Sequence, residues 1–149
     1  MRTVKDIISN KPKIVNIIAP EETVFNALQM LNTVNLSYLI IMKGEEYKGI
    51  FCERDYSRNV ILKGRTSTST KVIDVMTADL PVVAMDDTVE KCMNLINDFK
   101  TRYLLAFDDK RFAGVITIHD LLRQVLAAKT DVFDSSMAFK MLDQDEKIF

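Results

Sequence analysis

The feature that most constrains this chain is an internal repeat, because one structural unit has to fit both halves of the sequence. A shift of 65 residues superposes identical residues between positions 23 and 60 of the first half and the second half. The identical pairs are Thr23 with Thr88, Val24 with Val89, Asn32 with Asn97, Tyr38 with Tyr103, Leu39 with Leu104, Gly49 with Gly114, Asp55 with Asp120, Arg58 with Arg123 and Val60 with Val125. Ahead of this block the shift becomes 68 residues, so the first copy carries three extra residues around Asn10-Lys11-Pro12.

Both copies predict the same order of elements, a βαββα unit. Short β-branched runs are typical of strands, and acidic or hydroxyl residues before apolar residues at helical spacing indicate helix starts. Strands are predicted over residues 14–18, 38–42 and 48–52 in the first copy, and over residues 81–84, 103–107 and 112–117 in the second. A helix is predicted after the first strand of each copy, and a second one from about Asp55 and Asp120.

The predicted fold class is α/β, with two pseudo-symmetric βαββα repeats packed sheet to sheet and helices outside. Nearly continuous apolar strands favour sheets covered on both faces, and a half of about 60 residues is marginal alone. The predicted divisions are a first repeat over 1–63, a linker over 64–71, a second repeat over 72–128 and a C-terminal extension over 129–149. The extension has an amphipathic pattern. It is interpreted as packing on this module or a second subunit, or alternatively as a docking segment for a partner.

Composition narrows the classes of function. Twenty basic residues against 21 acidic ones weigh against nucleic acid as a partner, although Arg54, Arg58, Lys63 and Arg65 form a local basic cluster. The two cysteines form neither a disulfide framework nor a zinc motif, which favours a reducing compartment and two buried thiols. Since no apolar run approaches ~18 residues and no signal peptide is recognisable, we expect a cytoplasmic protein without a membrane partner.

Each copy ends in a Gly-h-h-Thr/Ser-x-x-Asp type of segment, where h is apolar: GIFCERD over residues 49–55 and GVITIHD over residues 114–120. A tandem of βαββα units with this ending resembles the cystathionine-β-synthase (CBS) domain pair, also called a Bateman module. Residues 51–67 are also similar to stand-alone CBS-pair proteins of bacteria and plant organelles. The resemblance spans residues 3–128, and the doubled pattern at a fixed shift carries it.

The resemblance implies a non-catalytic regulatory module that binds an adenosine-containing ligand in the cleft between the repeats and signals to a partner. AMP is the first choice of ligand, with ADP, ATP, NAD or S-adenosylmethionine as alternatives, and no catalytic cofactor is expected. The implied partners are a second copy, held through the CBS helices, and a regulated protein that the sequence does not identify. The alternative is a structural or interaction dimer whose nucleotide clefts have degenerated. An enzyme has little support, because one histidine and four glycines provide no nucleophile set or phosphate loop.

In the family, the Asp of each segment typically holds the ribose hydroxyls, the Thr or Ser approaches ribose or phosphate, and apolar strand residues surround the adenine. A carboxylate can accept both hydroxyls of a ribose, and a helix start favours phosphate, although an Asp at a helix start is more often only a cap. The candidate ligand-binding residues are Thr117, Asp120, His119, Ile118, Pro81, Val82, Val83, Arg102, Tyr103, Arg54, Arg58 and Asp55.

We expect the better site on the second copy. The first copy has Cys52 where the second has Thr117, and a thiol is a weak hydrogen-bonding group. Tyr38 would also fill the first pocket. His119 stands where relatives usually have Gly, and Leu105 where they often have Pro. His119 is therefore interpreted as a phosphate contact, an obstruction or an incidental residue. Arg102, Arg54 and Arg58 are the candidates for binding phosphate, with a solvated or salt-bridged helix face as the alternative for each.

Overall fold

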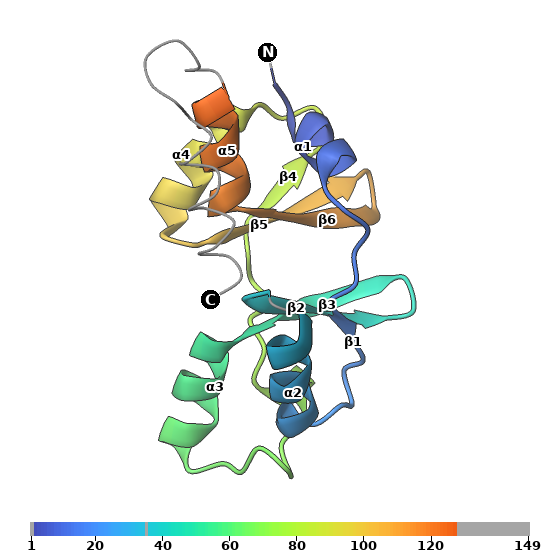
Figure 1. Cartoon of the computed structure of the whole chain (residues 1–149), viewed down its shortest axis with the longest axis vertical. Helices are drawn as coiled ribbons and strands as arrows, with labels where there is room; N and C mark the ends of the chain where they lie inside the picture. Colours follow the sequence, from blue (N-terminus) through green and yellow to red (C-terminus); the bar gives the residue numbers. More distant parts are fainter. Residues whose placement is uncertain (1, 35, 128–149) are drawn as a thin grey trace. The chain divides into compact units, whose positions relative to one another are not determined.

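The computed structural model describes residues 2–34 and 36–127, and within them the chain divides into two units (Figure 1). Unit 1 combines residues 2–13 with residues 80–127, whereas unit 2 contains residues 14–34 and 36–79. The C-terminal extension predicted over 129–149 lies outside the described residues. Each unit therefore contains one sheet and the helices that cover it, and the two units are described in turn.

Each unit is built on one three-stranded mixed sheet. The first strand pairs in parallel with the second, and the second pairs antiparallel with the third. The strands are β1 (Ile17–Ile18), β2 (Tyr38–Lys43) and β3 (Glu46–Cys52) in unit 2, and β4 (Val82–Ala84), β5 (Tyr103–Asp108) and β6 (Arg111–Thr117) in unit 1. The register is also repeated at the shift of 65, since Ile40 lies opposite Ile50 and Leu105 lies opposite Val115. These sheets confirm the α/β class and the duplicated unit.

Four helices follow the strands in the predicted order, and a further helix, α1, was not predicted. They are α1 (Val4–Asn10), α2 (Val24–Val34), α3 (Glu53–Asn59), α4 (Val89–Phe99) and α5 (Ile118–Ala127), with 3₁₀ turns η1 (Ile61–Lys63) and η2 (Val72–Asp74). Within the described residues, no helix has the length and apolar character needed to cross a bilayer.

Some predicted boundaries differ from those in the structure. The first strand is shorter than the predicted 14–18, because only Ile17 and Ile18 pair with β2 while Ile14 and Val15 are exposed. The helices predicted from about Asp55 and Asp120 begin two residues earlier, at Glu53 and Ile118.

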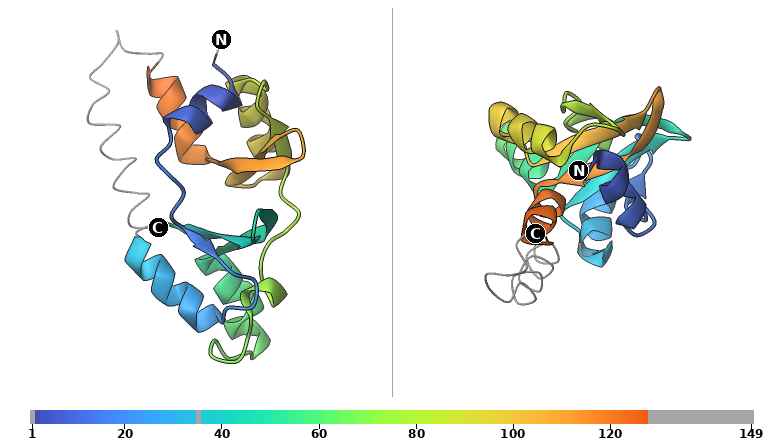
Figure 2. Two further views of the ribbon diagram at one scale, coloured as in Figure 1. Left: turned by 90° about the vertical axis from the view of Figure 1, so that its right-hand side faces the viewer. Right: turned by 90° about the horizontal axis from the view of Figure 1, so that it is seen from above.

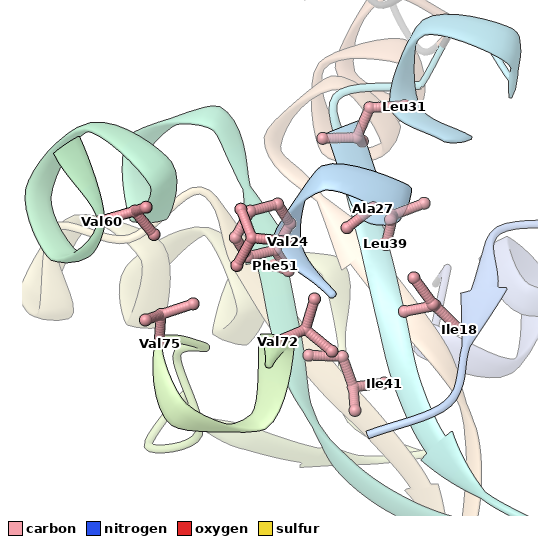
Figure 3. Close-up of a cluster of buried hydrophobic side chains, with 10 residues drawn as sticks. All are labelled: Ile18, Val24, Ala27, Leu31, Leu39, Ile41, Phe51, Val60, Val72 and Val75. Atoms are coloured by element: carbon pink, nitrogen blue, oxygen red, sulfur yellow. The ribbon is translucent and has the colours of Figure 1, made fainter. Parts of the chain in front are cut away.

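The core of unit 2 lies between its sheet and α2 (Figure 3). Alternate strand residues face the helix, as the two-residue period of a strand requires. The buried residues of this cluster are Ile18, Val24, Ala27, Leu31, Leu39, Ile41, Phe51, Val60, Val72 and Val75. Val72 lies in η2 and Val75 directly follows it, and both pack in unit 2 although they begin the second repeat in the sequence.

The core of unit 1 has the same plan, with α1 in the place of η2. Val4 and Ile7 of α1 join a cluster with Val83, Cys92, Ile96, Leu104, Ala106, Ile116 and Leu121. These two residues correspond to Val72 and Val75 at the shift of 68. Although α1 is far from β6 in the sequence, the two lie side by side (Figures 1 and 2). We call the segment ahead of the first strand of each copy its lead-in segment; it contains α1 in the first copy and η2 in the second. Each lead-in segment therefore packs on the sheet of the other copy.

Residues 64–71, predicted as a linker, pack on the start of α2 within unit 2. The amide of Val24 donates to the carbonyl of Thr70 at 2.8 Å, and the amide of Phe25 donates to that of Ser67 at 2.9 Å. These bonds satisfy amides that an α-helix leaves unpaired at its first turn. The chain passes between the units at residues 13–14 and 79–80 instead. The sequence repeats and the compact units are thus different divisions of the chain.

The packing of α1 can be tested at Ile7, which is 3% exposed. We expect Ile7→Ala to lower the free energy of unfolding by about 2–5 kcal/mol, because it leaves a cavity in the unit 1 core. The matched control is Ile61→Ala at a side chain that is 56% exposed, where we expect less than about 1 kcal/mol. Urea unfolding measures both, and an equal loss in the two variants would contradict the placement of α1.

Candidate functional site

The end of β6 and the start of α5 are joined by two reciprocal hydrogen bonds. The Thr117 amide donates to Oδ2 of Asp120 at 2.9 Å, and the Asp120 amide donates to Oγ1 of Thr117 at 3.1 Å. This arrangement is a capping box, in which two amides of the first helical turn are satisfied. Thr117 is therefore the cap, and Asp120 is the third helical residue rather than the residue that opens the helix. Both side chains are buried.

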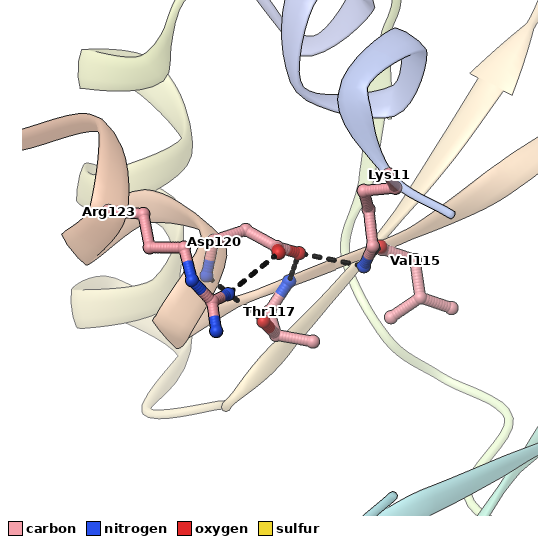
Figure 4. Close-up of polar contacts among 5 residues, drawn as sticks. All are labelled: Lys11, Val115, Thr117, Asp120 and Arg123. Atoms are coloured by element: carbon pink, nitrogen blue, oxygen red, sulfur yellow. Dashed lines mark hydrogen bonds and ion pairs between the residues drawn. The ribbon is translucent and has the colours of Figure 1, made fainter. Parts of the chain in front are cut away.

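Two basic side chains flank the Asp120 carboxylate (Figure 4). Lys11, which follows α1, places Nζ at 2.8 Å from Oδ2 of Asp120 and at 2.8 Å from the carbonyl oxygen of Val115. Arg123, one turn along α5, places Nη1 at 3.6 Å from Oδ1. The side chain of Asp120 is 9% exposed, against 26% for Lys11 and 24% for Arg123. The result is a mostly buried carboxylate beside two cations, in unit 1 alone.

We call the junction between the last strand and the helix that follows it the strand-to-helix corner. The corner of unit 2, between β3 and α3, has the same capping geometry as that of unit 1 but different hydrogen-bonding groups. The Cys52 amide and thiol both donate to Oδ2 of Asp55, at 2.9 and 3.3 Å. The hydroxyl of Thr77 donates to Oδ1 of Asp55 at 2.7 Å. Thr77 is also held to Ile50 by two main-chain hydrogen bonds of 2.9 Å. A neutral hydroxyl and a main-chain bridge thus take the place that the Lys11 ammonium takes in unit 1.

Gly49 permits this close approach in unit 2. A Cβ atom at this position would lie 2.9 Å from the carbonyl oxygen of Thr77, closer than real Cβ atoms approach a backbone oxygen. In unit 1, a Cβ at Gly114 would lie 3.0 Å from Cδ1 of Ile8, and its φ of +154° also favours glycine. The glycine of each segment therefore makes room for the lead-in segment.

The remaining predicted residues of unit 1 differ in burial and in their contacts. Val83 is buried in the apolar core, whereas Val82 is 57% exposed and Pro81 is half-buried. Arg102 is exposed, and its carbonyl accepts a hydrogen bond from the Ile118 amide at 3.1 Å, which ties the start of β5 to the start of α5. Tyr103, Ile118 and His119 are half-buried. Pro81 accepts from the Leu105 amide at 2.9 Å.

The other predicted residues lie in unit 2. Arg54 and Arg58 are exposed on α3, and Asp55 is buried at the start of that helix. The structure therefore collects most of the candidates in unit 1 and three of them in unit 2. Whether the two groups share one ligand stays a prediction.

Three residues whose side chains lie against the Asp120 or Asp55 carboxylate were not among the predicted site residues: Lys11, Arg123 and Thr77. Arg123 was visible as the repeat partner of Arg58, and Lys11 lies in the three-residue excess of the first copy. Neither signal identifies Asp120 as the partner of Lys11, because the sequence does not say on which sheet the lead-in packs.

Comparison with known proteins identifies the class that this duplicated fold defines, a tandem of two small α/β repeats. The family model for the CBS domain matches residues 72–127. The solved structure of the CBS domain protein NE2398 is 36% identical, with a TM-score of 0.77 over 85% of this chain and 99% of that one. The chain therefore belongs to the CBS domain family.

Two further relatives are informative. The mitochondrial CBS domain-containing protein CBSX3 of Arabidopsis thaliana is 32% identical over 83% of this chain and 65% of the plant protein, so the chain spans just under two thirds of that relative. A crystal structure of CBSX2 in complex with AMP is 26% identical, with a TM-score of 0.70 over 85% of this chain and 98% of that one.

Burial and the adjacent Asp55 carboxylate raise the pKa of the Cys52 thiol from 9.0 to about 11. Because only the thiolate reacts readily, we expect native Cys52 to be alkylated by iodoacetamide at pH 8 about 100-fold more slowly than in urea. Mass spectrometry of the Cys52 peptide measures both rates. Asp55→Asn removes the adjacent negative charge and should speed the native reaction, and a native rate equal to the unfolded rate would contradict the raised pKa.

The same pKa shift has a consequence for stability. Since the folded pKa lies above the unfolded value, the thiol stabilises the folded state below pH 9, and this contribution is lost as the pH rises toward 11. Cys92, whose pKa burial also raises to about 11, acts in the same direction.

Proposed function

We propose that this protein is a non-catalytic regulatory module that binds an adenosine-containing ligand at the Thr117–Asp120 corner and signals its occupancy to a partner protein. AMP is the first candidate, and ADP, ATP, NAD and S-adenosylmethionine are the alternatives. The observation that carries the proposal is the AMP bound to CBSX2, a relative that this chain covers over 98% of its length.

The chemistry of the corner supports a ligand with a sugar diol and an anionic group. Asp120 is an acceptor held in place by the Thr117 amide, so a hydroxyl that reaches it meets a fixed carboxylate. Lys11 and Arg123 give the same corner two positive charges, and the start of a ten-residue helix adds the positive end of its dipole. An adenosine phosphate has both groups.

The second copy is the better candidate for this ligand. In unit 2, Oδ1 of Asp55 already accepts a short hydrogen bond from Thr77, and Oδ2 accepts from the Cys52 thiol. In unit 1, Oδ1 of Asp120 has Arg123 at 3.6 Å, which is longer than a hydrogen bond and leaves lone pairs for a donor. We propose that Arg102, on the exposed loop before β5, contributes charge near this site.

A structural or interaction module is the second candidate, and one observation favours it. Both Asp55 and Asp120 already accept hydrogen bonds from their own chain, as residues with a purely structural role do. Exposed apolar side chains on helices of both units, Phe25, Met93, Phe99 and Leu122, would serve a homodimer held through helices. In this case no nucleotide would change the stability of the protein.

Thermal unfolding with AMP separates the two candidates. We expect millimolar AMP to raise Tm, because a ligand that binds only the folded state adds RT ln(1 + [L]/Kd) to its stability. Asp120→Asn keeps the shape and a carbonyl acceptor for the Thr117 amide but removes the charge. We expect it to weaken AMP binding by roughly 10–100-fold, the equivalent of one charge-assisted hydrogen bond.

The matched control is Asp108→Asn, at an exposed residue that ends β5 in the same unit. It should retain the full AMP response, and both variants should keep the circular dichroism of the parent protein. If neither AMP nor the alternative ligands shift Tm in the unaltered protein, the sensor proposal fails and the structural module stands.

A further inference from the structure

An open hollow in unit 2 is lined by residues that the proposed function does not use. It has a volume of about 220 Å³ and lies beyond the ends of the parallel strands β1 and β2. Its lining residues are Pro20, Glu21, Lys43, Lys48, Lys71 and Ile73. All of them belong to unit 2, so this hollow is complete within one unit.

Main-chain contacts hold the side of the hollow that η2 provides. The Ile73 amide donates to the carbonyl of Pro20 at 3.3 Å. Lys71, the residue before η2, forms an antiparallel bridge with Thr23, the residue before α2. The backbone that carries these side chains is therefore fixed by the fold, and a ligand would not have to order it.

The lining of the hollow has an excess of positive charge. It contains the ammonium groups of Lys43, Lys48 and Lys71 and one carboxylate, that of Glu21. Lys48 pairs at 2.8 Å with Glu46, which is not a lining residue, whereas in the described part of the chain Lys43 and Lys71 form no ion pair. The hydrogen bond and charge of Lys48, and after them the charge of Lys43, lower the pKa of Glu46, so both ammoniums act on the same part of the surface.

The equivalent place in unit 1 has the same frame without this charge. At the shifts of 65 and 68 the corresponding pairs are Pro20 with Met85, Glu21 with Asp86, Lys43 with Asp108, Lys48 with Ala113, Lys71 with Thr3 and Ile73 with Lys5. The Lys5 amide donates to the carbonyl of Met85 at 2.9 Å, as the Ile73 amide does to Pro20. Unit 1 thus has one ammonium and two carboxylates at these positions, and the lysines of unit 2 are not required by the shared fold.

The lining also has an apolar part. Pro20 is buried, Ile73 is 38% exposed, and the stems of the lysines add further apolar surface. The volume is below the about 300–1,000 Å³ of pockets that enclose drug-sized ligands, so the hollow suits a compact molecule. A short carbon skeleton with two negative charges would match both the apolar lining and the ammoniums. Phosphate monoesters and dicarboxylates share this chemistry.

We propose that the hollow of unit 2 binds a compact organic dianion through the ammoniums of Lys43, Lys48 and Lys71. The site is separate from the Thr117–Asp120 corner, which belongs to unit 1, so this inference does not rest on the proposed function. It assigns the difference in charge between the two copies to recognition of a second ligand rather than to folding.

Nuclear magnetic resonance of the full, isotope-labelled chain tests the site. The probes are butyl phosphate, succinate, inorganic phosphate and butanol, each at constant ionic strength. We expect butyl phosphate or succinate to shift the amides of residues 21, 43–48 and 71–73 in a saturable way, and the tighter of the two identifies the anionic group. Inorganic phosphate, which has no carbon skeleton, should bind more weakly, and butanol should not bind.

A double variant tests the role of the lysines. Lys43→Gln combined with Lys71→Gln removes two ammoniums and keeps most of each stem. We expect it to weaken the tighter probe by about tenfold or more, the equivalent of one hydrogen bond to a charged group. The matched control combines Lys5→Gln with Lys110→Gln, which removes the same charge from two exposed residues of unit 1 and should leave the affinity unchanged. Circular dichroism checks that both variants keep the fold.

Several outcomes would overturn the inference. If neither organic probe shifts these amides, or if the two double variants lose the same affinity, the lysines are only a solvated surface. Equal affinities for inorganic phosphate and the tighter organic probe would show that the apolar lining contributes nothing. Shifts confined to residues 117–123 would place the probe at the corner of unit 1, which would leave the proposed function standing and remove this second site.

Discussion

The packing of each lead-in segment on the sheet of the other copy is the constraint on which the rest of this structure depends. A three-stranded sheet with two helices leaves part of its apolar face uncovered, and Val4 and Ile7 cover it in unit 1 as Val72 and Val75 do in unit 2. Unit 1 is therefore complete only when residues 2–13 join residues 80–127, and unit 2 is complete only when its stretch extends past the first repeat to include Val72 and Val75. The same packing brings Lys11, the residue after α1, to the strand-to-helix corner of unit 1. The core and the candidate site therefore both depend on where α1 packs.

The two corners show how a duplicated fold can keep its geometry and change its chemistry. The glycine, the capping Thr or Cys and the Asp occupy equivalent positions in both copies, and the hydrogen bonds from the cap amide to the Asp are both 2.9 Å long. What differs is the group contributed by the lead-in segment. Thr77 donates two hydrogen bonds without adding charge, whereas Lys11 also adds a cation. The asymmetry expected from Cys52 and Thr117 is thus accompanied by a second one, in the group that the lead-in segment brings to the carboxylate.

Much of the fold was predictable, because the repeat allowed each element to be read twice. A weak helix or strand signal in one copy gained support from its partner 65 residues away, and the sheets confirm both readings. The differences arose where the contacts of a segment do not follow from its local sequence pattern. Residues 14 and 15 are apolar like a strand but exposed. Residues 64–71 have the composition of a linker, and the structure adds that they pack on α2. Local composition does not report such contacts.

The candidate site was predictable only in part, for a related reason. The Thr117 and Asp120 pair could be found because their spacing is local and resembles a known family segment. Lys11 lies 109 residues from Asp120, and that contact follows from which sheet α1 covers. A residue that completes a site across such a distance is visible in sequence only as an irregularity, in this chain the change of the repeat shift from 68 to 65.

The capping role of Asp120 does not exclude a role in binding, because the two use different parts of the carboxylate. The cap requires one lone pair of Oδ2, and Lys11 uses another. Oδ1 faces Arg123 at a distance beyond hydrogen bonding. The capping bond fixes the orientation of the group in advance, so a ligand would not have to order it. A carboxylate that is oriented through Oδ2 by the main chain and by Lys11 is a structural element and, through Oδ1, also an acceptor for a hydroxyl.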